Sequence, residues 1–192
     1  MQLSKQEARN LFRRKRTELT AKERLRLDDL LLIRFQQLPL PPLSCIHSYL
    51  EAPAKNELPT EKMIRYLEFA HPSLTVTIPR INPLTNQLES VVYDDATVLQ
   101  LNALGIAEPV NGNVIPAEQL DLLIVPLLAF DRYGYRAGYG KGYYDAYLAG
   151  CRPDVITVGC SYFEPLEKIT DTAHFDIPLN FCVTPQQLYE FG

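Results

Sequence analysis

Residues 120–145 read LDLLIVPLLAFDRYGYRAGYGKGYYD, an apolar run joined to a glycine-rich loop. The run at 120–125 is almost continuously apolar, as is typical of a strand covered on both faces of a sheet. The glycine-rich segment follows within a few residues, and a short helical pattern begins at Tyr143. Ligands of parallel α/β sheets bind beyond the carboxyl ends of the strands. This order of strand, loop and helix therefore predicts a fold class and the place of a site.

The rest of the chain alternates helical and strand-like patterns. Ser4 to Glu7 and Thr20 to Glu23 are capping boxes that predict two helix starts, the second helix running to Phe35. Thr60 is expected to cap a third helix that ends near residue 69. Strands are expected at 45–50, 74–78 (ending at Pro79), 91–93, 120–125, 155–160 and 181–184.

This alternation predicts an α/β protein with a mainly parallel sheet. No internal repeat or long linker interrupts the 192 residues. We therefore expect residues 1–192 to form a single-domain three-layer α/β/α sandwich around that sheet.

Composition is that of an ordinary soluble globular protein. The net charge is −4, which argues against bulk nucleic-acid binding, although nine of the 19 Lys and Arg residues lie before position 27. No apolar run approaches the roughly 20 residues of a membrane span. There is no secretory pattern, and the four cysteines lack metal-ligand spacing. Buried, reduced thiols and a cytoplasmic location are the expectation.

Residues 130–145 combine glycines, two cations and a carboxylate. Glycines let a ligand approach the backbone closely, and the cations Arg136 and Lys141 are suited to binding a phosphate. Asp145 supplies the hard oxygen that Mg²⁺ prefers. The segment is neither a Walker A loop nor a dinucleotide fingerprint, because Lys141 is followed by glycine and then tyrosines. The alternative is a tight surface turn covered by its tyrosines.

The stretch PLLAFDRYGYRAGYGKGYYD, residues 126–145, closely resembles the signature of the 5-formyltetrahydrofolate cyclo-ligase family. The resemblance extends in matching order over nearly the whole chain, through positions that include Lys5, Arg9, 56–57, 78–80, 108–109 and Asp176. Three features depart from the family pattern, and one is the His-Asp pair, which here reads His174-Phe175-Asp176. Asn180 stands where an acidic residue is usual, and Ile81 where an aromatic residue often follows the Pro-Arg pair.

The resemblance implies ATP-dependent closure of 5-formyltetrahydrofolate to 5,10-methenyltetrahydrofolate, with release of ADP and phosphate. The formyl oxygen is a poor leaving group until it is phosphorylated, after which N10 can displace it as phosphate. Such a site must align two substrates and neutralise the moving phosphoryl group, and it needs no covalent nucleophile.

The resemblance also implies roles for particular residues. Lys5 and Arg9 share a helix face that Arg13 extends, whereas Arg14, Lys15 and Arg16 are expected at the surface. The carboxylate of Glu57 would accept paired hydrogen bonds from the pterin. Arg136 and Lys141 are the expected catalytic cations. The expected ATP ligands are Lys5, Arg9, Arg136, Gly138, Gly140, Lys141, Gly142, Tyr143 and Tyr144, the folate ligands are Glu57, Arg80 and Tyr144, and the Mg²⁺ ligands are Asp145 and Asp176.

Other functions remain open at this point. One is a different ATP-dependent kinase or ligase of small molecules that uses the same loop. Another is a nucleic-acid-binding module that uses the basic amino-terminal arm, which the net charge and the lack of an aromatic-basic motif disfavour. The expected partners are small-molecule substrates only, with no nucleic acid and no membrane, for a monomer or weak homo-oligomer.

Overall fold

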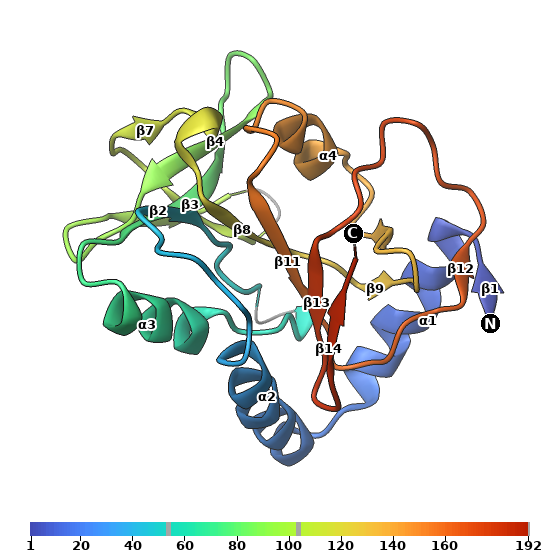
Figure 1. The fold of residues 1–192 in the computed structure, drawn as a ribbon. Helices are drawn as coiled ribbons and strands as arrows, with labels where there is room; N and C mark the ends of the chain where they lie inside the picture. Colours follow the sequence, from blue (N-terminus) through green and yellow to red (C-terminus); the bar gives the residue numbers. More distant parts are fainter. Residues whose placement is uncertain (53–54, 103–104, 192) are drawn as a thin grey trace.

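The computed structural model describes residues 1–52, 55–102 and 105–191. Within them, an eight-stranded sheet has the order β14-β13-β11-β8-β2-β3-β4-β7 (Figure 1). The strands from β13 to β3 are parallel, and β14, β4 and β7 are antiparallel to their neighbours. The bounds are β14 (Leu188–Glu190), β13 (Phe181–Val183), β11 (Ile156–Cys160), β8 (Leu122–Val125), β2 (Cys45–His47), β3 (Thr75–Ile81), β4 (Leu88–Val92) and β7 (Val114–Ile115).

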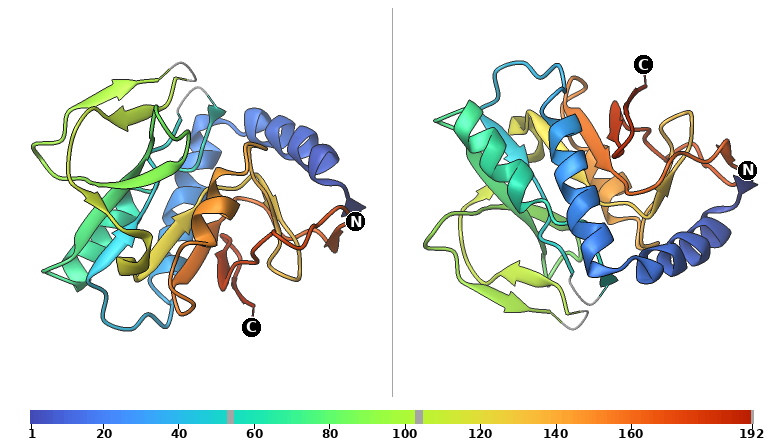
Figure 2. Two further views of the ribbon diagram at one scale, coloured as in Figure 1. Left: turned by 90° about the horizontal axis from the view of Figure 1, so that it is seen from above. Right: turned by 90° about the horizontal axis from the view of Figure 1, so that it is seen from below.

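Helices lie on both sides of this sheet. Helices α2 and α3 cover one face, α4 lies on the other, and α1 lies to the side that holds both termini (Figures 1 and 2). None of the helices in the described residues is long and apolar enough to cross a membrane. The bounds are α1 (Lys5–Glu18), α2 (Ala21–Phe35), α3 (Glu61–Ala70) and α4 (Tyr143–Leu148).

Strand β8 explains why the layers form. All four of its residues are buried, and successive side chains of a strand point to opposite faces. Leu122 and Ile124 join the core beneath α2 and α3, whereas Leu123 and Val125 join the core beneath α4. The prediction of a mainly parallel sheet between helices is therefore confirmed.

The predicted helix starts are also confirmed. Both capping boxes form, at Ser4 with Glu7 and at Thr20 with Glu23, and each satisfies backbone N–H groups that the first helical turn leaves unpaired. Helix α3 does follow Thr60, but the Thr60 side chain makes no cap. Its hydroxyl donates instead to the Tyr49 carbonyl, which ties the start of α3 to the segment after β2.

One expectation about strands was wrong, and several short strands were not predicted. Strand β3 does not end at Pro79 but continues to Ile81, because β2 pairs with β3 only as far as Thr77 and the missing N–H interrupts no bond to β2. Short pairs outside the main sheet were not predicted. They are β1 (Gln2–Leu3) with β12 (Lys168–Ile169), β9 (Ala129–Phe130) with β10 (Arg136–Ala137), and β5 (Leu99–Leu101) with β6 (Ala107–Pro109).

Candidate functional site

A cavity of about 620 Å³ opens at the carboxyl ends of β2, β3 and β8, the edge at which parallel sheets bind ligands. Its walls come from α1, the segments after β2 and β8, strands β3 and β4, the β5–β6 pair, the glycine loop and the start of α4. The charged residues that line it are Lys5, Arg9, Arg13, Lys55, Glu57, Glu108, Arg136, Lys141, Asp145 and Asp176. Apolar walls include Pro79, Ile81, Leu88, Ile106 and Leu128.

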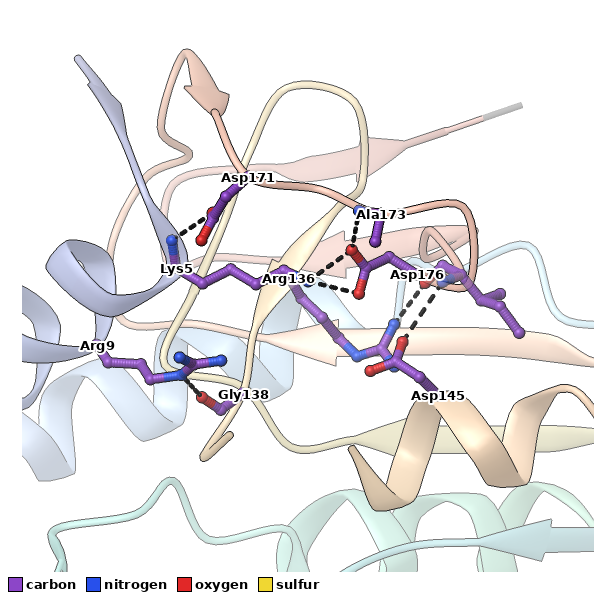
Figure 3. A network of polar contacts seen from close by, with 9 residues as sticks. Lys5, Arg9, Arg136, Gly138, Asp145, Asp171, Ala173 and Asp176 are labelled. Atoms are coloured by element: carbon purple, nitrogen blue, oxygen red, sulfur yellow. Dashed lines mark hydrogen bonds and ion pairs between the residues drawn. The ribbon is translucent and has the colours of Figure 1, made fainter. Parts of the chain in front are cut away.

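The α1 cation row consists of Lys5, Arg9 and Arg13, spaced four residues apart so that all three face the cavity. The Lys5 ammonium lies 2.5 Å from both carboxylate oxygens of Asp176 (Figure 3). Arg9 donates from Nε to the Gly138 carbonyl at 2.9 Å, and its two Nη groups have no partner in the described chain. The row therefore keeps free guanidinium donors at the cavity wall.

Asp176 is held in its charged form. Burial opposes ionisation, but the Ala173 N–H and the Lys5 ammonium outweigh it and lower the pKa of Asp176. Because Lys5 and the Ala173 N–H engage both carboxylate oxygens, this carboxylate is already neutralised by the protein (Figure 3).

Arg136 and Asp145 form a second ion pair on the cavity wall. Arg136 is buried, and its guanidinium donates to the Ile177 carbonyl at 2.5 Å and to Asp145 Oδ1 at 2.8 Å (Figure 3). Burial lowers the pKa of Arg136, although the Asp145 charge opposes that shift. Two partners thus fix the direction of the Arg136 guanidinium.

The glycine loop brings backbone close to α1. Gly140 has a φ of +93°, and a Cβ placed there would lie 3.3 Å from Arg9 Cζ. Gly142, with φ +73°, begins α4 in the left-handed region and has open space around it. Gly134 does not line the cavity, because a Cβ placed there would contact Phe191 and the Leu179 carbonyl. Gly140 and Gly142 are therefore the cavity-lining glycines whose positive φ disfavours other residues.

Lys141, Tyr143 and Tyr144 differ in how the protein holds them. Lys141 is exposed and has no hydrogen-bond or ion-pair partner among the described residues. The Tyr143 hydroxyl donates to Asn86 at 3.1 Å. The Tyr144 hydroxyl lies 3.2 Å from Nε2 of His47, whose pKa burial lowers to about 3. Lys141 is thus an exposed cation with no partner among the described residues, and the Tyr144 hydroxyl contacts the sheet through His47.

Glu57 lies among aromatic and cationic groups on the cavity wall. It is 9% exposed and accepts the Ala52 N–H at 3.0 Å. Tyr139 lies close to Glu57, and Lys55 sits 5.4 Å from the centre of the Tyr139 ring. Sequence reasoning missed Lys55 and did not assign Tyr139 to the site, although the position of Tyr139 between two glycines was a signal that it could reach the cavity.

Two other expectations need correction, for Arg80 and Arg16, and the structure also places Asn180. The structure does not bring Arg80 to the cavity, because strand alternation turns it away from Pro79 and Ile81 and toward Glu89, 2.9 Å distant. Arg16 was expected at the surface but is 3% exposed. Asn180 is not among the cavity residues, and its Oδ1 accepts hydrogen bonds from Thr157.

No group of three or more His, Cys, Asp or Glu side chains in the described part of the chain is arranged to hold a metal ion. The two carboxylates expected to bind Mg²⁺, Asp145 and Asp176, do line the same cavity. Among described residues, Asp145 accepts hydrogen bonds only through Oδ1, from Arg136 and the Ile177 N–H. A metal would therefore need further ligands from a substrate.

A charged cavity at the strand ends of a mainly parallel α/β sheet defines an enzyme that acts on small, charged molecules. The chain belongs to the 5-formyltetrahydrofolate cyclo-ligase family, a family of ligases whose sequence profile matches residues 1–185.

Relatives agree with this assignment. The 5-formyltetrahydrofolate cyclo-ligase of Escherichia coli K12 is 34% identical over 70% of this chain and 75% of its own length. That of Mycoplasma genitalium is 28% identical over 94% of this chain and 98% of its own. The solved structure of Aquifex aeolicus 5,10-methenyltetrahydrofolate synthetase superimposes with a TM-score of 0.80 at 29% identity, covering 97% of this chain and 92% of that one.

Proposed function

We propose that this protein closes 5-formyltetrahydrofolate to 5,10-methenyltetrahydrofolate in a reaction driven by ATP. ATP phosphorylates the formyl oxygen, N10 attacks the activated carbon, phosphate leaves, and the N10 proton is released. The observation that supports this most is the cavity itself. It combines free cationic donors from α1 and the glycine loop with apolar walls and the carboxylate of Glu57.

The cationic groups suit the triphosphate. Arg9, Arg13 and Lys141 face the cavity without an ion-pair partner in the described chain, and phosphate oxygens would supply one. Arg136 is held by two protein partners, whereas Lys141 has none among the described residues. A positive charge held in place before reaction stabilises charge that develops on the moving phosphoryl group, because no reorganisation is needed at that moment.

The remaining walls suit the folate. Glu57 offers acceptor oxygens to the 2-amino and ring N–H groups of a pterin. Ile81, Leu88 and Ile106 supply apolar surface for flat rings. Ile81 keeps this wall apolar where the family often has an aromatic ring.

Mg²⁺ is expected to accompany ATP. Mg²⁺ is commonly bound by one or two carboxylates together with phosphates and water. Asp145 fits, since its Oδ2 is not engaged by any described residue, whereas Asp176 becomes a ligand only when Lys5 turns from it toward a phosphate. When bound, Mg²⁺ neutralises phosphate charge.

A direct assay tests the proposal. Purified protein, ATP, Mg²⁺ and 5-formyltetrahydrofolate should give the methenyl product, followed by its absorbance, and ADP in equal amounts. ATP consumption that is absent, or that does not depend on the folate, would contradict the assignment. Thermal-shift measurements with ATP–Mg²⁺, the folate and single-stranded RNA separate the remaining alternatives, because only true ligands raise the apparent stability.

A further inference from the structure

Arg16 is a buried cation on the helix that carries the α1 cation row. One guanidinium nitrogen donates to the Leu127 carbonyl at 2.5 Å and the other to the Tyr139 hydroxyl at 3.1 Å. Its Nε is also buried and has no partner in the described chain. Burying a guanidinium with an unsatisfied donor is unfavourable, and an apolar residue would fill the same space at less cost. Packing alone therefore does not account for Arg16.

Tyr139 connects Arg16 to Glu57. Its hydroxyl accepts from the Arg16 guanidinium at 3.1 Å and lies close to the Glu57 carboxylate. Burial first, and then the charge of Glu57, raise the pKa of Tyr139, so its hydroxyl stays protonated beside that carboxylate. Arg16 and Glu57 are both more than nine-tenths buried, and the phenol between them lets their opposite charges compensate.

We propose that Arg16 is a positioning residue for the folate: acting through Tyr139, it fixes the orientation of the Glu57 carboxylate that receives the pterin. This inference rests on the proposed function. The Ala52 N–H donates to one Glu57 oxygen at 3.0 Å, and the Tyr139 hydroxyl, held by Arg16, lies beside the same carboxylate. Preorganised acceptors bind better because less ordering is required when the ligand arrives.

The position of Arg16 on α1 dictates how the proposal must be tested. Arg16 lies three residues after Arg13 and seven after Arg9, on the same helix face. A general disturbance of α1 would therefore weaken ATP binding as well. A positioning role through Tyr139 predicts a loss confined to the folate.

The experiment measures binding of 5-formyltetrahydrofolate and, separately, of a non-hydrolysable ATP analogue with Mg²⁺ by calorimetry. Arg16→Met removes the cation, and Tyr139→Phe removes only the hydroxyl while keeping the ring. Each should raise the folate Kd about tenfold, the scale of one lost hydrogen bond to a charged group. The double variant should be no worse than either single one, because both changes break the same chain of contacts. The affinity for the ATP analogue should not change.

Arg14→Met is the matched control. Arg14 is on the same helix, its side chain is 70% exposed, and it lies 3.8 Å from Glu18 only, so folate binding should stay as in the wild type. Tyr139→Phe keeps the Arg16 bond to Leu127 and serves as the test if Arg16→Met fails to fold.

Three results would overturn the assignment of Arg16. They are wild-type folate affinity in both single variants, additive losses in the double variant, and equal losses for folate and ATP analogue in Arg16→Met. A wild-type protein that binds no folate would overturn the proposed function itself, and that result is visible before any variant is made.

Discussion

Lys141 is exposed on the glycine loop and unpaired within the described chain, so its charge is available to a substrate. Lys141→Met keeps the aliphatic stem, and the fold should be unaffected. If Lys141 follows the phosphoryl group, turnover should fall about a hundredfold, the usual effect of losing one transition-state contact. Steady-state kinetics with ATP varied would separate a loss in turnover from a loss in ATP affinity.

The control for Lys141 is Lys22→Met, which removes an exposed cation that is not among the cavity residues. Its kinetics should match the wild type. Unaltered turnover and ATP affinity in Lys141→Met would instead favour the alternative of a surface turn with an exposed lysine.

The roles of Asp145 and Asp176 in Mg²⁺ binding can be compared by substitution. Asp145→Asn removes the charge that pairs with Arg136 and that would face Mg²⁺, so turnover should fall and the Mg²⁺ concentration needed for half-maximal rate should rise. Asp176→Asn should have a weaker effect on that Mg²⁺ requirement, because Lys5 and the Ala173 N–H already occupy its oxygens. Mg²⁺ titrations of the rate test this, and an unchanged titration in Asp145→Asn would remove it from the metal site.

For residues of α1, the sequence predicts the helix face on which a side chain lies but not whether that side chain is buried. The spacing of Lys5, Arg9 and Arg13 was enough to place them on one helix face, and the structure brings that face to the cavity. The same rule did not show that Arg16 is buried. Depth is set by what packs on the helix, here Leu127 and Tyr139, more than 100 residues away in the chain.

The conformation of the glycine loop can be tested by comparing alanine substitutions at Gly140 and Gly142. Gly140→Ala places a Cβ 3.3 Å from Arg9 Cζ at a φ of +93°, so it should move Arg9 and raise the KM for ATP. Gly142→Ala meets no neighbour and carries only the strain of its positive φ, on the order of 1 kcal/mol. The first should therefore raise the KM for ATP more than the second, as kinetics with both variants would show. Equal KM values would mean that the contact with Arg9 does not hold the guanidinium for ATP.

Helices and central strands were more predictable than the small strand pairs. A capping box and an apolar stripe are local signals, and a fully apolar run such as β8 needs only a sheet to cover it. Strands β1 and β12 have two residues each, and their partners lie far apart in the chain. No local pattern identifies such a pair, because its stability comes from the neighbours it meets only after folding.

The unfolding of the whole molecule should depend on pH through His47. Its folded-state pKa of about 3 lies below the ordinary value of 6.5, so on acidification the unfolded chain takes up a proton that the folded chain does not. Stability from this group is present above pH 6.5 and is lost as the pH falls toward 3. One proton corresponds to a slope of about 1.4 kcal/mol per pH unit.

Urea unfolding between pH 7 and 4 tests this expectation. His47→Gln should lose stability with a shallower slope than the wild type, and His174→Gln, which changes a histidine outside the sheet, should keep the wild-type slope. If the free energy of unfolding falls equally steeply with pH in the wild type and in His47→Gln, His47 does not cause the loss of stability at low pH. A single transition in these curves is also expected if residues 1–192 form one domain.

The contacts that join α1 to the end of the chain have a consequence for biosynthesis. The ribosome makes Lys5 early, but its partner Asp176 emerges 171 residues later, and β12, which pairs with β1, emerges shortly before Asp176. A nascent chain can assemble the core of α2, β2 and α3 while its first helix still lacks these partners. Substrates stabilise only the conformation that binds them. The growing polypeptide must therefore reach its last segments before nucleotide or folate can protect it from proteolysis.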